Sequence, residues 1–137
     1  MDQVITIPYK PREHQLAIHD AVDSHRFSVA VCHRRFGKTV AAINQIIKAA
    51  VLCGRDNPRY AVVCPTYTQA KRVAWDYVTQ YTRPLDPKVN ISELRVDFMG
   101  RRISLYGADN PDSLRGIYLD GVVLDEVGDM NPKIWNE

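Results

Sequence analysis

A short segment near residue 35 constrains the fold of this 137-residue chain more than any other feature. The sequence from Cys32 to Thr39 reads Cys-His-Arg-Arg-Phe-Gly-Lys-Thr and follows an apolar, strand-like run from Phe27 to Val31. A chain that turns from a strand into a helix presents unpaired backbone N–H groups at the positive end of the helix dipole, where they can bind phosphate oxygens. The segment therefore predicts a strand, a phosphate-binding loop and a helix in direct succession.

Each specified position of the usual phosphate-loop pattern, G-x-x-x-x-G-K-[ST], has a physical role. This segment departs from the pattern only at its first position, Cys32. Gly37 allows close approach of the backbone, Lys38 can reach the β- and γ-phosphates, and the Thr39 hydroxyl can coordinate Mg²⁺. An ordinary helix preceded by a glycine turn remains the alternative for this segment alone. The predicted nucleotide-binding residues here are Cys32, His33, Arg34, Arg35, Phe36, Gly37, Lys38 and Thr39.

A second motif, Gly-Val-Val-Leu-Asp-Glu from Gly121 to Glu126, places Asp125 86 residues after Thr39. Its apolar, β-branched run predicts a buried parallel strand that ends in two carboxylates. Open α/β sheets place their ligand sites at the carboxyl ends of such strands. Asp125 would hold Mg²⁺ through water, and Glu126 would orient and deprotonate the attacking water. A solvated acidic loop is the alternative for the Asp-Glu pair alone, but the order and spacing of the two motifs favour a joint site.

Other polar residues are candidates for the same site. A glutamine amide can pair with N6 and N7 of adenine, so Gln15 upstream of the loop would select ATP. Arg34 or Arg35 could face the γ-phosphate and stabilise charge in the transition state. Arg115 lies on an apparently exposed loop ten residues before Asp125. A surface glutamine and solvated arginines are the corresponding alternatives.

The rest of the chain alternates between strand-like and helix-like segments. Apolar periodicity predicts helices from about Pro11 to His25, from Lys38 to about Gly54, and after Pro65, and strands at 27–31, 60–64, 94–98, 103–105 and 121–126. The strands at 94–98 and 103–105 are separated by a turn at Gly100, which indicates a small antiparallel hairpin. This order predicts a three-layer α/β fold on a parallel sheet.

Composition limits the partners. The net charge is only +2, from 18 Lys plus Arg against 16 Asp plus Glu, so any nucleic-acid contact must be local. The basic pairs Lys71-Arg72 and Arg101-Arg102 could grip polymer phosphates, although a solvated face explains them equally well. The three cysteines lack metal-ligand spacing, and no apolar stretch approaches membrane-spanning length. These features predict a reduced, soluble, cytoplasmic protein without a membrane partner.

Taken together, these residues resemble the large terminase subunit of tailed double-stranded DNA bacteriophages, the ATPase that drives genome packaging into the procapsid. The resemblance spans essentially the whole chain. The motifs that carry it are Tyr9, Pro11 and Gln15, the phosphate loop from Arg34 to Thr39, Pro65-Thr66, Arg115-Gly116, and Leu124-Asp125-Glu126.

The resemblance implies that residues 1–137 are the N-terminal, incomplete portion of a RecA-like ATPase domain of the additional catalytic glutamate type. On this resemblance, we expect residues 1–137 to lack the nuclease domain of the family. It also implies ATP and Mg²⁺ as cofactors, double-stranded DNA, portal protein and small terminase subunit as partners, a homo-oligomeric ring, and a place in the host cytoplasm on the procapsid. The implied roles are phosphate and metal binding by Lys38 and Thr39, metal binding by Asp125, water activation by Glu126, γ-phosphate sensing by Arg34, and presentation of Arg115 to a neighbouring subunit.

Two other functions remain open on the sequence alone. A helicase-like DNA translocase shares the upstream glutamine, the phosphate loop and the Asp-Glu strand, although Val127-Gly128 departs from the Ala-Asp or Ala-His tail frequent in that group. A truncated nucleotide-binding remnant would bind ATP without turnover.

Overall fold

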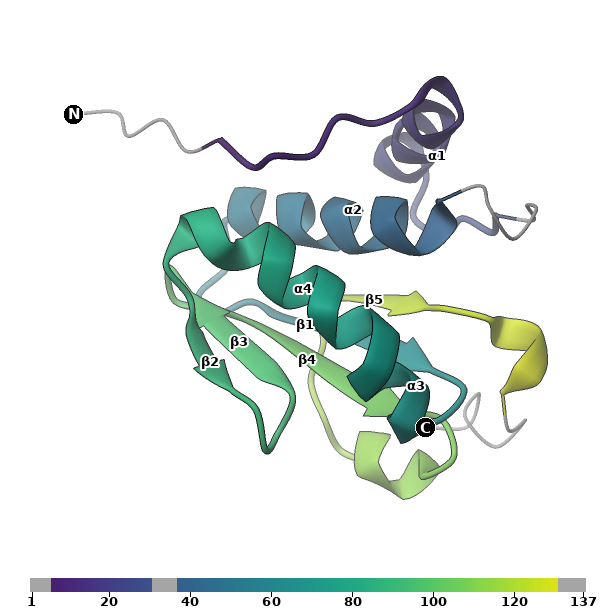
Figure 1. The fold of residues 1–137 in the computed structure, drawn as a ribbon, viewed down its shortest axis with the longest axis vertical. Coiled ribbons are helices and arrows are strands. Elements are labelled where there is room, and N and C mark those ends of the chain that lie inside the picture. Colours follow the sequence, from purple (N-terminus) through teal and green to yellow (C-terminus); the bar gives the residue numbers. More distant parts are fainter. Residues whose placement is uncertain (1–5, 31–36, 131–137) are drawn as a thin grey trace.

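The computed structural model describes residues 6–30 and 37–130 as one α/β unit (Figure 1). Its helices are α1 (Glu13–Ser24), α2 (Lys38–Leu52), α3 (Tyr67–Gln69), the π-helical turn η2 (Ala70–Ala74), α4 (Trp75–Thr82), and the 3-10 turns η3 (Arg83–Leu85), η4 (Pro111–Leu114) and η5 (Val127–Asp129). Its strands are β1 (Arg59–Cys64), β2 (Lys88–Asn90), β3 (Arg95–Phe98), β4 (Arg101–Gly107) and β5 (Gly121–Leu124).

The five described strands form one sheet in the order β2-β3-β4-β1-β5. Strand β1 pairs in parallel with β4 on one side and with β5 on the other, in a register that places Val63 opposite Leu124. Strands β2, β3 and β4 pair antiparallel. The predicted α/β fold, with a parallel core and an antiparallel hairpin, is therefore confirmed, and β2 is an additional short strand.

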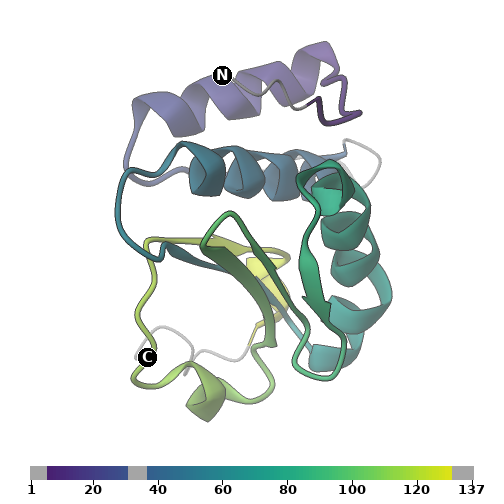
Figure 2. The ribbon, with the colours of Figure 1, turned by 90° about the vertical axis from the view of Figure 1, so that its left-hand side faces the viewer.

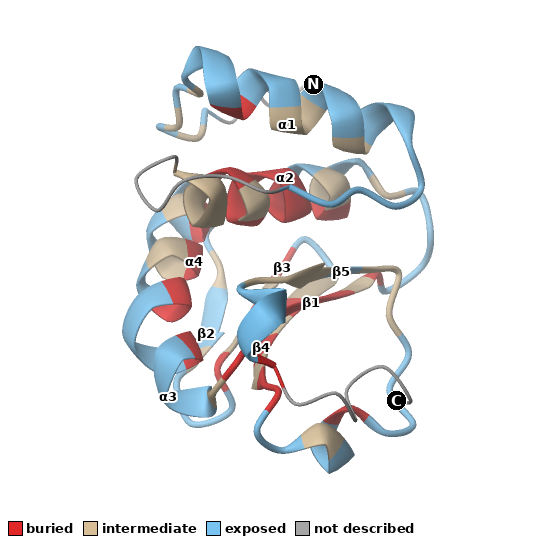
Figure 3. Cartoon of the chain, turned by 90° about the vertical axis from the view of Figure 1, so that its right-hand side faces the viewer, coloured by how far each residue is buried: buried red, intermediate tan, exposed pale blue. Residues whose placement is uncertain are grey.

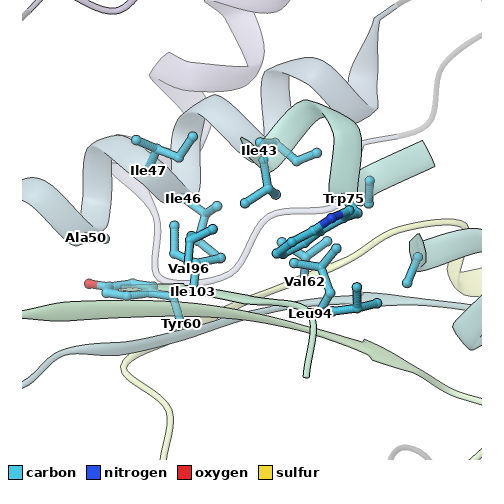
Figure 4. Close-up of a cluster of buried hydrophobic side chains, with 14 of the residues drawn as sticks. Ile43, Ile46, Ile47, Ala50, Tyr60, Val62, Trp75, Leu94, Val96 and Ile103 are labelled. Atoms are coloured by element: carbon cyan, nitrogen blue, oxygen red, sulfur yellow. The ribbon is translucent and has the colours of Figure 1, made fainter. Parts of the chain in front are cut away.

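Helix α2 and the α3-η2-α4 helix cover one face of the sheet, and α1 lies on the outer side of α2 (Figures 1 and 2). The main core lies between these layers. There, Ile43 and Ile47 of α2 and Trp75 of α4 pack against strand residues such as Val62 and Ile103 (Figure 4). Because apolar residues recur at three- and four-residue steps along α2, its inner face is buried, whereas most of α1 stays exposed (Figure 3).

The opposite face of the sheet carries a smaller cluster. Val63 packs there with Ala108, Leu114 and Met130, which come from the segments after β4 and β5. Helix η4 lies on this side, across the sheet from α2 (Figures 1 and 3). Because β1 is parallel to both β4 and β5, the carboxyl ends of these three strands lie at one edge of the sheet, where Asp125 meets Thr39 of α2.

The basic pair Arg101-Arg102 is used inside the fold. The Arg101 guanidinium donates to the carbonyl oxygens of Ala50 at 2.6 Å and Cys53 at 3.0 Å, which are free acceptors at the end of α2. Arg102 binds Asp97 on the neighbouring strand at 2.6 Å. These contacts favour a structural role for the pair over the phosphate contacts that its sequence allowed.

The expected strand from Phe27 to Val31 is wrong over its described part, because residues 27–30 form no strand. Phe27 and Val29 are 82% and 91% exposed. Instead of a sheet ladder, local side-chain bonds tie this segment to the end of α1, since the Ser28 hydroxyl donates to the carbonyl oxygen of Ala21 at 3.4 Å. An apolar, strand-like pattern is a local signal. It does not show whether a neighbouring strand is available to form the backbone hydrogen bonds that a strand needs.

Candidate active site

The two sequence motifs meet at the start of α2. The Thr39 hydroxyl donates a hydrogen bond of 3.0 Å to the Asp125 carboxylate, across 86 residues of sequence. Asp125 is held at the end of β5 because its backbone N–H donates to the Val63 carbonyl oxygen at 2.9 Å. The first turn of α2 and the carboxyl end of β5 thus form one polar site.

A second contact joins the same two elements. Lys38 Nζ lies 3.2 Å from Glu126 Oε1, and the two side chains are 26% and 46% exposed. Glu126 has a φ of 55°, in the left-handed region that non-glycine residues seldom adopt. This backbone conformation turns the chain sharply after Asp125 and separates the directions of the two adjacent carboxylates. One of them therefore reaches Thr39 while the other reaches Lys38.

Burial raises the pKa of the Asp125 carboxyl above its ordinary value, and the nearby Glu126 charge adds to this effect. The Thr39 hydrogen bond and the Lys38 charge oppose it. A half-buried carboxylate beside a second one disfavours its own ionised form unless a cation compensates the charge. The electrostatics of this position therefore favour a bound cation.

The residues present fit Mg²⁺ as a partly protein-bound ion. The Thr39 hydroxyl and the Asp125 carboxylate are hard oxygen ligands of the kind that Mg²⁺ prefers. Within 6–30 and 37–130, no group of three or more His, Cys, Asp or Glu side chains could hold a metal ion by itself. Because Mg²⁺ usually keeps several waters and binds through one or two protein oxygens plus phosphates, this sparse set is sufficient.

Gln15 lies beside Gly37, and both ends of its side-chain amide are hydrogen-bonded to the protein. Its Nε2 donates to the Gly37 carbonyl oxygen at 3.0 Å, its Oε1 accepts from the Arg12 backbone N–H at 2.9 Å, and the residue is 4% exposed. The contact with Arg12 is half of a capping box at the start of α1, for which a glutamine at the third helical position is the sequence signal. No comparable sequence pattern predicted the contact between Gln15 and Gly37, which are 22 residues apart. Pairing of Gln15 with adenine stays a prediction.

Gly37 itself begins α2 with a φ of 83°. A Cβ atom at this position would lie 2.6 Å from both Arg12 Nη2 and Gln15 Nε2. The left-handed conformation is therefore the main reason for glycine here, and the ends of the Arg12 and Gln15 side chains would have to move to admit a Cβ atom.

The remaining predicted site residues are placed elsewhere or lie outside the described part of the chain. Arg115 follows η4 and is 70% exposed, with its Nη2 3.3 Å from the Asp112 carboxylate. The turn η4 that precedes it lies on the other side of the sheet from α2, so the structure does not bring Arg115 to the Thr39–Asp125 contact (Figure 1). The loop residues outside the described ranges are Cys32, His33, Arg34, Arg35 and Phe36.

Comparison with known proteins identifies the family. No protein-family model matches the chain. The large terminase subunit of Thermus virus P23-45 is 30% identical over an alignment of 150 positions that covers 94% of this chain, and the large terminase subunit of Thermus phage G20c matches equally well. Over 94% of its length the chain is homologous to large terminase subunits. It spans 30% of the length of those two relatives.

Solved structures of a large terminase ATPase domain are also similar to this chain. The large terminase ATPase domain of Thermus phage P74-26 has a TM-score of 0.75 and 27% sequence identity, with 96% of this chain and 59% of that chain covered. A single-residue variant of that domain gives a TM-score of 0.69 at 26% identity with the same coverage. The terminase chain therefore has the fold of this ATPase domain over the portion that it spans. None of its described helices is both long and apolar enough to cross a membrane.

Proposed function

We propose that this terminase chain binds ATP with Mg²⁺ and hydrolyses it, as part of a motor that moves viral double-stranded DNA into the procapsid. The observation that carries the proposal is the 3.0 Å contact between Thr39 and Asp125, with the Lys38–Glu126 pair beside it. These four side chains supply a cation that can bind phosphate, two metal ligands and a carboxylate base within one site. The large terminase relatives support the packaging role.

In this proposal each side chain of the site has a separate task. The Lys38 ammonium binds the β- and γ-phosphates, and its ion pair with Glu126 opens as it does so. Thr39 and Asp125 hold Mg²⁺, which neutralises phosphate charge when bound. Glu126 then orients a water molecule and accepts its proton as the water attacks the γ-phosphorus. Glu126 is the more exposed of the two adjacent carboxylates and is therefore the more accessible to that water.

The partners follow from the same proposal. Arg101 and Arg102 are bound within the fold, so DNA contact falls to other basic groups, of which the pair Lys71-Arg72 on η2 is exposed. Arg34 would sense the γ-phosphate from within the loop, and Arg115 would reach a neighbouring subunit of a ring. Portal protein, small terminase subunit and a location in the host cytoplasm belong to the packaging role that the relatives support.

The decisive experiment compares Lys38→Ala and Glu126→Gln in the full polypeptide. We expect Lys38→Ala to lose nucleotide binding, and Glu126→Gln to retain binding while phosphate release falls roughly a hundredfold or more. Lys48→Ala is the matched control, because Lys48 lies on the same helix but pairs with Asp23 at 2.7 Å. Binding is measured with a fluorescent ATP analogue and turnover as phosphate release.

Three results would contradict the proposal. Normal hydrolysis by Glu126→Gln would remove the assigned base. ATP binding without phosphate release by the unaltered protein would leave a nucleotide-binding protein without turnover. ATP-dependent unwinding of a tailed duplex would identify a helicase-like translocase instead of a packaging motor.

A further inference from the structure

The strand that carries the acidic pair has few contacts of its own to fix its position. Strand β5 is only four residues long, and its described ladder is with β1 on one side. None of its residues is fully buried, and Val122 is 49% exposed. A strand with so little burial specifies its register weakly.

The register of β5 nevertheless determines the geometry of the site. A slip of two residues would keep every β5 side chain on its present face of the sheet, but it would move Asp125 by about 6.6 Å along the strand direction. The 3.0 Å contact between Asp125 and Thr39 could not survive such a shift. Some contact outside the strand ladder must therefore select the observed register.

Asp120, the residue immediately before β5, makes such a contact. Its side chain is only 4% exposed, and Oδ2 accepts the backbone N–H of Arg59 at 2.9 Å. Its Oδ1 accepts the Tyr118 hydroxyl at 2.8 Å and Arg55 Nη1 at 3.1 Å. The backbone N–H of Asp120 also donates to the Arg59 carbonyl oxygen at 2.7 Å. Two of these four hydrogen bonds join Asp120 to Arg59, the first residue of β1, and the other two join it to Tyr118 and Arg55.

The contacts of Asp120 also connect the segments that build the site. Arg55 belongs to the connection between α2 and β1, and Arg59 begins β1. Next to Asp120, a Cβ atom on Gly121 would lie 2.7 Å from the Tyr60 ring, so β5 can approach β1 this closely only with glycine at its first position. The chain leading from α2 is therefore joined to the start of the strand that ends in Asp125 and Glu126.

We propose that Asp120 is a positioning residue, whose bonds to Arg59 and Arg55 set the register of β5 and thereby hold Asp125 at Thr39. The proposal deepens the proposed function and rests on it for its effect on catalysis. The register itself can be measured without turnover. Asp120 acts from the opposite end of β5 and touches none of the reacting groups assigned above.

The test measures both register and catalysis in Asp120→Ala. We expect the amide hydrogen of Asp125, which is bonded to the Val63 carbonyl oxygen, to exchange at least about tenfold faster, because misregistered strands lose this bond. We expect kcat for ATP hydrolysis to fall about tenfold or more while KM stays within about twofold, since displaced catalytic groups slow the reaction but Lys38 still binds phosphate. Tyr118→Phe removes one of the bonds and should give smaller changes in the same directions.

Two control variants separate positioning from general destabilisation. Asp56→Ala alters an exposed acidic residue of the same connection as Arg55 and should leave exchange and kcat unchanged. Ile47→Val weakens the main core, against which Val123 of β5 packs, but removes none of the hydrogen bonds of Asp120, and it should change global stability without the split between kcat and KM.

The results that overturn the inference differ from those that overturn the proposed function. Unchanged exchange of the Asp125 amide in both Asp120→Ala and Tyr118→Phe would refute the positioning role. An equal loss of kcat in Ile47→Val at matched stability would refute it as well. If the unaltered protein releases no phosphate, the proposed function fails, and the positioning role is then decided by the amide exchange alone.

Discussion

The guanidinium of Arg101 caps the end of α2, and its removal should measurably destabilise the protein. The last turn of α2 contains no basic residue, so Arg101 from β4 supplies the only cation described there. It donates to Ala50 O at 2.6 Å and to Cys53 O at 3.0 Å. Each such bond from a half-exposed charged donor contributes about 1 kcal/mol, and the interaction with the helix terminus adds about 0.5 kcal/mol.

These contributions predict that Arg101→Ala lowers the free energy of unfolding by about 2.5 kcal/mol. For a domain of this size the corresponding fall in Tm is roughly 8–10 °C. Thermal unfolding followed by circular dichroism at neutral pH measures the change. Arg101→Lys should recover less than half of the loss, because an ammonium cannot present two parallel donors in the same geometry.

The matched control for this prediction is Arg72→Ala, which removes an exposed arginine from another helix and should change stability by less than about 0.5 kcal/mol. If Arg101→Ala were as stable as the unaltered protein within the same margin, the capping argument would be refuted. If Arg101→Ala bound DNA more weakly but kept full stability, Arg101 would instead be interpreted as a contact to DNA phosphates, as the sequence allowed.

Two further predictions concern the site. Gly37→Ala should lower the free energy of unfolding by about 1–2 kcal/mol in urea titrations, because it forces an alanine into a left-handed conformation and displaces Gln15, whereas Gly54→Ala, where a Cβ meets no atom within 4 Å, should not. Asp125→Asn should abolish phosphate release yet stabilise the fold at pH 7 in thermal unfolding measured from pH 3 to pH 8. Burial raises the folded-state pKa of Asp125, so the carboxyl favours folding most below its unfolded pKa of about 3.9 and that contribution is lost as the pH rises through the folded pKa. The gain in Asp125→Asn should accordingly vanish below about pH 4, and an equal gain at pH 3 would show that burial of the charge is not its cause.

The juxtaposition of the two motifs could be inferred from the sequence because it depends on general rules. Parallel strands place their carboxyl ends at one edge of the sheet, so the sequence predicted that the Lys38-Thr39 segment would lie near the acidic pair after β5. That juxtaposition is present although the strand expected before the segment is not formed at residues 27–30. The antiparallel hairpin was equally readable, since alternating residues flank Gly100. The chemical roles of Lys38 and Glu126 are still predictions.

Other features depend on tertiary neighbours that no local pattern records. Arg101 and Arg102 read as a surface pair, yet each finds an acceptor on a different element. Asp120 has no motif, and its importance follows from three donors that only the folded chain brings together. The segment at 27–30 shows the reverse case, in which a sound strand pattern lacks a described partner strand.

The ion pair between Lys38 and Glu126 has a consequence for the timing of the proposed cycle. While Lys38 Nζ lies 3.2 Å from Glu126 Oε1, the ion pair occupies that carboxylate, so it is not available to orient an attacking water. A triphosphate that draws Lys38 away would free Glu126 to act as the base, and departure of the products would let the ion pair re-form. Binding of ATP would then itself permit hydrolysis, and the site would stay inactive between rounds of nucleotide binding.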